Sequence, residues 1–223
     1  MTTLLELLQE RPLTGHCFKP EYYIKADIHS GLLESRGGYR LAAFPEMLLK
    51  AIYSGLRYET GQAARVILYN CGQEWGQEFF RRFEQELTQY HQQPLVDLPI
   101  GVLIDAFQDL WATHGWGRLN LNFEHGDHGL VEAIVFNSGF AAAARVAHPD
   151  QLTQEPSCYL EAGVLSTVFS KLSGRDLTCV QTQCESMGSD RNCFLIGTSQ
   201  RLRDCPEWIR KGISHSEILQ RLL

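Results

Sequence analysis

Two consecutive segments in the last third of the chain decide the fold. They read CYLEAGVLSTVFSKLSG over residues 158–174 and LTCVQTQCESMGSDRNCFLIG over residues 177–197. In the first, apolar residues recur at every fourth position from Leu160 to Leu172, which predicts an amphipathic helix that ends at the Ser-Gly pair. In the second, two strand-like stretches flank Gly188, which predicts a β-hairpin.

A second hairpin is predicted upstream of this motif. Residues 118–124 alternate apolar and polar side chains, residues 125–129 read HGDHG and predict a turn, and residues 130–136 predict the return strand. Apolar residues at helical spacing predict three earlier helices, at 45–60, 62–90 and 100–114. Helices followed by strand pairs that flank a helix predict an α+β fold, an antiparallel β-sheet with helices packed against it.

The composition excludes several classes of protein. The 223 residues are 44% hydrophobic and 21% charged, which is typical of a globular protein. A net charge of −6 argues against general nucleic-acid binding, which needs a basic face. No stretch approaches the roughly 18 uninterrupted apolar residues of a transmembrane segment, and the first ten residues lack the basic start of a secretory signal. We therefore expect a cytoplasmic protein.

We expect three parts along the chain. Residues 1–35 predict an N-terminal helix and arm, and residues 36–200 predict one ligand-binding domain with its core motif at 129–197. Residues 201–223 predict a weakly amphipathic C-terminal tail. Within the domain, residues 39–44 predict a short strand.

Two glycines lie on adjacent turns of the long helix predicted at 62–90. Gly72 and Gly76 would let another backbone, or a flat ligand, approach this helix closely. Tight helix packing is the simpler interpretation.

Aromatic side chains gather near the end of the helix predicted at 100–114. His114 lies between Trp111 and Trp116, and two aromatic faces with one ring nitrogen suit a pocket for a flat aromatic or tetrapyrrole ligand. Packing at the helix end, with His114 near the last carbonyls, is the alternative. The candidate ligand-binding residues are Trp75, Phe79, Trp111, His114, Trp116 and Phe136.

Four of the seven cysteines lie between residues 158 and 193. Thiolates that meet near one hairpin can bind zinc, which prefers a tetrahedron of nitrogen and sulfur ligands. The candidate zinc ligands are Cys158, Cys184 and Cys193. No C-x-x-C pair is present, and burial as small apolar side chains is the alternative.

No catalytic motif is readable in the sequence. It lacks a dinucleotide fingerprint, a Walker A loop and a G-x-S-x-G elbow. Glu132 and Glu161 are isolated acids with no partner visible in the sequence.

The run from Cys158 to Gly163, followed by a helix and then by Val180 to Gly188, resembles the 4-vinyl-reductase (4VR) domain family. The resemblance extends over most of the chain after about residue 35. It implies a helix-and-sheet ligand-binding fold, commonly dimeric, whose members look like small-molecule binders rather than reductases. The chain looks most like stand-alone cyanobacterial members linked to pigment synthesis and photosystem assembly.

The resemblance also implies a zinc site of reduced quality. Sensory members of the family hold zinc with a Cys before the helix, then Glu-x-x-Cys, then a Cys just before an apolar strand. Cys158 and Cys184 match, but the Glu position holds Gln181 and the last position aligns with Asn192. Neutral amides are poor zinc ligands, so a third ligand is available only if Cys193 turns inward.

We therefore expect non-catalytic binding of a hydrophobic small molecule, a tetrapyrrole such as a bilin or a chlorophyll precursor. The expected role is an accessory factor in pigment synthesis or photosystem II assembly, with photosystem or pigment-synthesis proteins as partners. We expect a homodimer in the cytoplasm or at the thylakoid surface. The alternatives are a vinyl-group reductase of chlorophyll biosynthesis and a protein-interaction module without a ligand.

Overall fold

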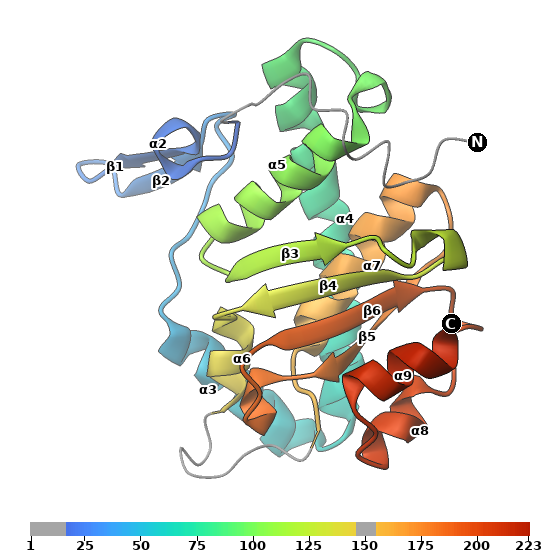
Figure 1. The fold of residues 1–223 in the computed structure, drawn as a ribbon. Helices are drawn as coiled ribbons and strands as arrows, with labels where there is room; N and C mark the ends of the chain where they lie inside the picture. Colours follow the sequence, from blue (N-terminus) through green and yellow to red (C-terminus); the bar gives the residue numbers. More distant parts are fainter. Residues whose placement is uncertain (1–16, 146–154) are drawn as a thin grey trace.

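A four-stranded antiparallel sheet forms the centre of the protein (Figure 1). The computed structural model describes residues 17–145 and 155–223. The strand order is β3-β4-β6-β5, built from the hairpin of β3 (Arg118–Asn122) and β4 (Val131–Phe136) and the hairpin of β5 (Thr178–Gln183) and β6 (Asn192–Gly197). Both hairpins lie where the sequence predicts them. With helices packed on this sheet, the predicted α+β class is confirmed.

Helices α4, α5 and α7 pack on the inner face and the β3 edge of the sheet. Helix α7 (Tyr159–Ser173) lies against β5 and β6, and the 29-residue α4 (Ala63–His91) lies against α7 (Figure 1). Helix α5 (Ile100–Thr113) packs beside β3. All three helices match their predicted ranges within a few residues, because each carries an apolar face at helical spacing.

The glycines of α4 allow the close approach of α7. A Cβ added at Gly72 would lie 2.2 Å from the carbonyl oxygen of Leu160, and one added at Gly76 would lie 2.9 Å from Cβ of Thr167. Both distances are shorter than any normal van der Waals contact. The glycine pair therefore serves helix packing, the simpler of the two interpretations.

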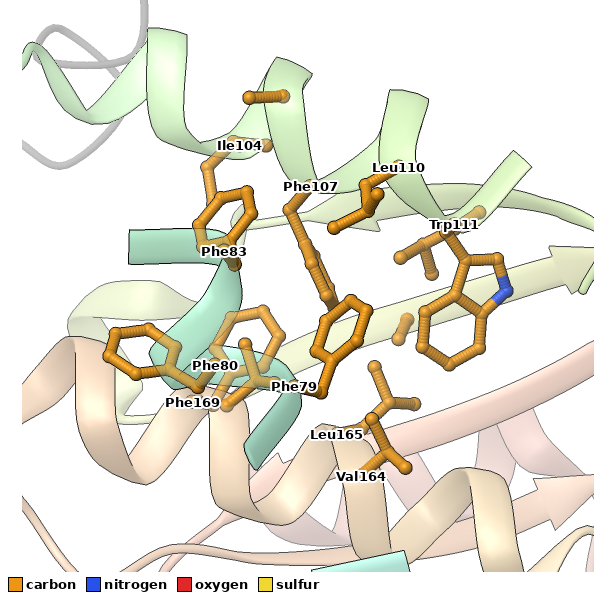
Figure 2. Close-up of a cluster of buried hydrophobic side chains, with 14 of the residues drawn as sticks. Phe79, Phe80, Phe83, Ile104, Phe107, Leu110, Trp111, Val164, Leu165 and Phe169 are labelled. Carbon is orange, nitrogen blue, oxygen red and sulfur yellow. The ribbon is translucent and has the colours of Figure 1, made fainter. Parts of the chain in front are cut away.

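The main core lies between α4, α5, α7 and the sheet, and it is rich in aromatic rings (Figure 2). Phe107 and Trp111 of α5 point toward Val164 and Leu165 of α7, and Phe83 of α4 fills the space beside Phe107. Phe107 and Trp111 are wholly buried. Each such side chain contributes roughly 1.5–3 kcal/mol of burial free energy to the inner layer.

Helices α8 (Cys205–Arg210) and α9 (His215–Leu222) cover the opposite, outer face of the sheet (Figure 1). A second, smaller core forms there around Leu195 of β6 and Ile218 of α9. Helix α9 starts with a capping box, in which Ser214 Oγ accepts the Glu217 N–H and the Glu217 carboxylate accepts the Ser214 N–H. The predicted tail of residues 201–223 thus includes a helical layer packed on the sheet.

The N-terminal part departs from the prediction. Helix α2 (Pro20–Tyr23) leads into a small hairpin of β1 (Ile24–Asp27) and β2 (Leu32–Ser35). Residues 39–44, predicted as a strand, contribute only an isolated bridge from Arg40 to Glu34. The helix predicted near the N-terminus lies outside the described residues.

Short elements complete the fold. Helix α3 (Glu46–Thr60) packs against α6 (Gly139–Ala144). Single 3₁₀ turns follow α4, connect β3 to β4 and connect β5 to β6, as η1 (Leu95–Asp97), η2 (Gly126–His128) and η3 (Glu185–Met187). Within residues 17–145 and 155–223, no helix combines the length and apolar character needed to cross a bilayer.

Candidate functional site

Five of the six predicted ligand-binding residues meet in one group, which we call the aromatic cluster: Trp75, Phe79, Trp111, His114 and Trp116. Trp116 is its centre. The Trp116 ring centroid lies 4.7 Å from those of Trp75 and His114, 5.1 Å from that of Trp111 and 5.3 Å from that of Phe79. The two tryptophan pairs are edge-to-face, the geometry that aromatic packing favours.

These rings pack against one another and leave no slot between them for a planar guest. Trp111 is fully buried, and its indole Nε1 has no hydrogen-bond partner among the described residues. His114 Nδ1 donates to the Leu110 carbonyl at 2.8 Å, and burial lowers the pKa of His114. His114 is therefore a neutral ring at pH 7. The expected groove between Trp111 and Trp116 is filled by their own contact.

Phe136 lies on the other side of the sheet. Strand residues alternate between faces, and Ala133 and Val135 of β4 point into the main core. Phe136 therefore points outward, where the Arg118 guanidinium carbon lies 4.5 Å from its ring centroid. It does not join the aromatic cluster, contrary to the expectation from sequence.

An apolar cavity of about 300 Å³ lies along the edge strand β5, between α7 on the inner side and α8 on the outer side. We call it the β5 cavity. Its volume is at the lower end of the range of about 300–1,000 Å³ that is typical of ligand pockets. The residues that line it are Arg65, Val66, Tyr69, Glu155, Pro156, Tyr159, Ala162, Cys179, Val180, Gln181, Pro206, Ile209 and Arg210. Sequence reasoning missed it because its walls come from segments far apart in the chain.

Polar groups at the β5 cavity are few and mostly engaged. The Tyr69 hydroxyl lies 2.9 Å from Thr178 Oγ1 and accepts the Cys179 N–H at 3.3 Å, which fixes the tyrosine ring against β5. Arg65 forms an ion pair with Glu155, and its guanidinium carbon lies 6.0 Å from the ring centroid of Tyr159. The cavity therefore offers two tyrosine rings and one cation to a ligand.

A buried thiol pair lies at the start of α7. The Sγ atoms of Cys158 and Cys184 are 3.8 Å apart, and Ser186 Oγ is 3.0 Å from Cys184 Sγ. Hydrogen bonds from the Cys158 thiol and from Ser186 and Ser157 lower the pKa of Cys184 to about 5. Burial, together with the adjacent Cys184, raises the pKa of Cys158 well above its usual value. One proton is thus shared between two sulfurs.

The side chains around this thiol pair do not fit a zinc ion. Gln181 Oε1 accepts the Cys158 N–H at 2.9 Å, and Asn192 Oδ1 accepts from Gln181 Nε2 at 3.2 Å and from the Glu185 N–H at 3.0 Å. Both amide oxygens are occupied by these hydrogen bonds. Two thiols and two engaged neutral amides do not make the set of four anionic or imidazole donors that zinc prefers.

Cys193 is separated from the thiol pair by the alternation of β6. Asn192 points inward to Cys158, so the next residue points outward. Cys193 Sγ instead donates to Gln183 Oε1 at 3.4 Å and lies close to Glu132 and His215. Of the three predicted ligands, the structure brings Cys158 and Cys184 together and places Cys193 on the other face.

Glu161 is wholly buried on the first turn of α7. Ser138 Oγ donates to its carboxylate at 3.1 Å. Burial outweighs this hydrogen bond and raises the pKa of Glu161 to about 8. The side chain that lacked a visible partner in the sequence is therefore a neutral, hydrogen-bonded acid at pH 7.

Part of the chain matches a known protein family, and most of it matches a known fold. Residues 145–198 match the family profile of the vinyl-4-reductase (4VR) domain. No curated protein sequence matches the chain. The crystal structure of the phenol-responsive sensory domain of the transcription activator PoxR with phenol superposes with a TM-score of 0.65 at 16% identity, covering 94% of this chain and 98% of that one. The two proteins therefore share a fold over nearly their whole lengths.

Two further solved structures are similar at lower scores. One is a vinyl-4-reductase family protein from Methanocaldococcus jannaschii, with a TM-score of 0.46 and 13% identity over 70% of this chain and 82% of that one. The other is a trafficking protein particle complex subunit 3 from Naegleria fowleri covalently bound to palmitic acid, with a TM-score of 0.47 and 14% identity over 68% and 93%. Through its residues 145–198, the chain belongs to the 4-vinyl-reductase (4VR) domain family.

Proposed function

We propose that the protein binds a small hydrophobic molecule that carries an aromatic or pyrrole ring, and that it holds this molecule in the β5 cavity without transforming it. The observation that carries the proposal is the cavity itself, about 300 Å³ of mainly apolar space beside two tyrosine rings. The 4VR domain and the fold shared with a phenol-bound sensory domain support the same class of ligand.

The size of the β5 cavity predicts modest affinity. Burying roughly 200 Å² of apolar ligand surface at about 25 cal/mol per Å² yields about 5 kcal/mol before ordering costs. That free energy corresponds to a Kd on the order of 0.1–1 mM, which suits a sensor or carrier of an abundant small molecule. Stacking on Tyr69 or Tyr159, or contact with the Arg65 guanidinium, strengthens binding further.

A tetrapyrrole is the ligand that the family resemblance favours, and it is larger than the β5 cavity. A bilin or a chlorophyll precursor therefore inserts one pyrrole ring and leaves the remainder outside. The role as an accessory factor in pigment synthesis or photosystem assembly, the homodimer and the thylakoid surface rest on the resemblance alone and stay predictions.

The test compares two ligand classes and two sites. Calorimetric titration with phenol and absorbance titration with a linear bilin are carried out on the native protein, on Ala162→Leu and on Trp116→Phe. Ala162 is a buried wall of the β5 cavity, so the leucine side chain fills it, whereas Trp116 belongs to the aromatic cluster. Ile209→Trp blocks the cavity from the α8 side and serves if Ala162→Leu is unstable.

We expect the native protein and Trp116→Phe to bind one of the two ligands, and the cavity-filling variants to lose at least about tenfold in affinity. Tenfold corresponds to about 1.4 kcal/mol. Loss in Trp116→Phe with retention in Ala162→Leu would move the ligand to the aromatic cluster and contradict the β5 cavity. Absence of binding to both ligands would contradict the proposed function.

A further inference from the structure

We propose that Glu132, Cys193 and His215 form a zinc-binding site on the outer face of the sheet, where it ties α9 to the strands. One donor atom from each residue lies within 4.8 Å of the other two. Among the described residues, this is the group whose donor atoms combine sulfur, nitrogen and oxygen at such short range. The site is separate from the thiol pair and from the β5 cavity, and it does not depend on the proposed function.

Sheet register and helix capping bring the three residues together. Cys193 of β6 is paired with Ile134 of β4, so both point to the outer face, as does Glu132 two residues before Ile134. His215 is the first residue of α9, whose start is set by the Ser214 capping box. No two of the three ligands are close in the sequence.

Hydrogen-bond accounting leaves a position for a cation between His215 and Glu132. Thr182 Oγ1 donates its one hydrogen to the Cys193 carbonyl at 3.2 Å, so at 2.7 Å it accepts from His215 Nδ1. The other ring nitrogen, Nε2, then faces Glu132 Oε1 at 2.8 Å. A neutral ring would direct a lone pair at a carboxylate, so a proton or a metal ion must lie between them.

Each of the three ligands is held by a further side chain. Thr182 orients the His215 ring, Asn122 Nδ2 donates to Glu132 Oε2 at 3.2 Å, and Gln183 Oε1 accepts from the Cys193 thiol at 3.4 Å. Such supporting hydrogen bonds are typical of metal sites, where they fix the tautomer and the orientation of the ligands. An accidental cluster has no reason to carry all three.

The donor set selects zinc among common metal ions. One thiolate, one imidazole and one carboxylate suit a borderline-soft ion in tetrahedral geometry, with a fourth position left for water. Ligand distances of about 2.0–2.3 Å place the donor atoms about 3.3–3.6 Å apart. The His215–Glu132 pair must open by about half an ångström and the Cys193 sulfur must approach by about one, which side-chain rotation supplies. Zinc binding also removes the thiol proton of Cys193.

The site would act as a staple between two layers. Helix α9 is held to the sheet by the small outer core around Leu195 and Ile218. A bond from His215 through zinc to β4 and β6 adds a second attachment at the start of the helix. We therefore expect zinc to stabilise the C-terminal helices without requiring any ligand in the β5 cavity.

The test uses the full chain, stripped of metal with a chelator and titrated with Zn²⁺ against a chromophoric competitor. Co²⁺ in place of Zn²⁺ reports a sulfur ligand through its thiolate charge-transfer band. The variants are Cys193→Ser, His215→Gln and Thr182→Val, and the matched control is Cys184→Ser, which removes a buried thiol on the inner face. His215 is only partly buried, so His215→Gln keeps the test valid if Cys193→Ser does not fold.

We expect one Zn²⁺ per chain, a cobalt–thiolate band that Cys184→Ser retains and Cys193→Ser loses, and a loss of at least tenfold in zinc affinity in His215→Gln. Thr182→Val, which only releases the His215 ring, should weaken binding by about 10- to 100-fold. Zinc should raise the Tm of the native protein and not that of Cys193→Ser. No zinc bound by the native protein, or a thiolate band that survives in Cys193→Ser or disappears in Cys184→Ser, would overturn the proposal.

Discussion

Gly72 of α4 and Gly163 of α7 lie directly against each other where the two helices cross. A Cβ added at Gly163 would lie 2.2 Å from the Tyr69 carbonyl oxygen and 2.9 Å from the backbone of Gly72. The obstructing atoms are main-chain atoms, which no side-chain rotation can remove. The spacing of the two helices, and with it the position of α7 over the sheet, is therefore fixed by the absence of side chains.

Gly163→Ala should destabilise the protein strongly. An overpacked position costs about 1–3 kcal/mol, and a clash with backbone belongs at or above the upper end of that range. Chemical denaturation measures the change. The matched control is Gly55→Ala in α3, where an added Cβ has open space around it. It should stabilise the protein by about 0.4–1 kcal/mol, because alanine restricts the unfolded chain. Equal effects at both positions would contradict the close helix crossing.

Removal of two tyrosine hydroxyls should have opposite effects on stability. The hydroxyl of Tyr53 is buried without a hydrogen-bond partner among the described residues, and burial raises the pKa of Tyr53. The hydroxyl of Tyr69 makes two hydrogen bonds, to Thr178 and to the Cys179 N–H. We expect Tyr53→Phe to be neutral or stabilising, and Tyr69→Phe to cost about 0.5–1.5 kcal/mol in urea denaturation. A loss in Tyr53→Phe as large as that in Tyr69→Phe would indicate a partner for Tyr53.

Glu161 should make stability depend on pH. Its pKa is raised to about 8 in the folded state, against 4.5 in the unfolded chain, so the folded state binds the proton more tightly. Stability therefore falls as pH rises between these two values, by at most about 1.4 kcal/mol for each pH unit. Glu161→Gln removes this titration. Its stability relative to the native protein should rise from pH 5 to pH 8 in parallel urea titrations, and a constant difference would contradict the buried neutral acid.

The native protein should contain one rapidly reacting thiol. Cys71 is exposed on α4, and the other six cysteines are buried. Thiol reagents attack accessible thiolates, so Ellman's reagent should modify one equivalent quickly in the folded protein and seven in denaturant. Cys71→Ser should show no fast phase. A second fast equivalent that persists in Cys71→Ser would mean that one of the buried thiols is reached through local opening.

The hairpins and long helices could be predicted from sequence because periodicity reports burial directly. The strand predicted at residues 39–44 failed because that segment makes a single bridge to Glu34 and lacks a pairing partner. The outward positions of Phe136 and Cys193 were available in principle, since each follows a residue that points inward. Glu132 and His215 are 83 residues apart, and only the packing of α9 on the sheet brings them into contact. The walls of the β5 cavity are equally scattered along the chain.

All six residues of β6 are buried, because the strand has a neighbour on each edge and helices over each face. Its amide hydrogens can exchange with solvent only when the two hairpins separate, which amounts to global unfolding. Detachment of α8 and α9 alone would wet the side chains of one face and leave those amides protected. Hydrogen–deuterium exchange should therefore resolve two events, an early opening of the C-terminal layer and a late loss of protection along β6.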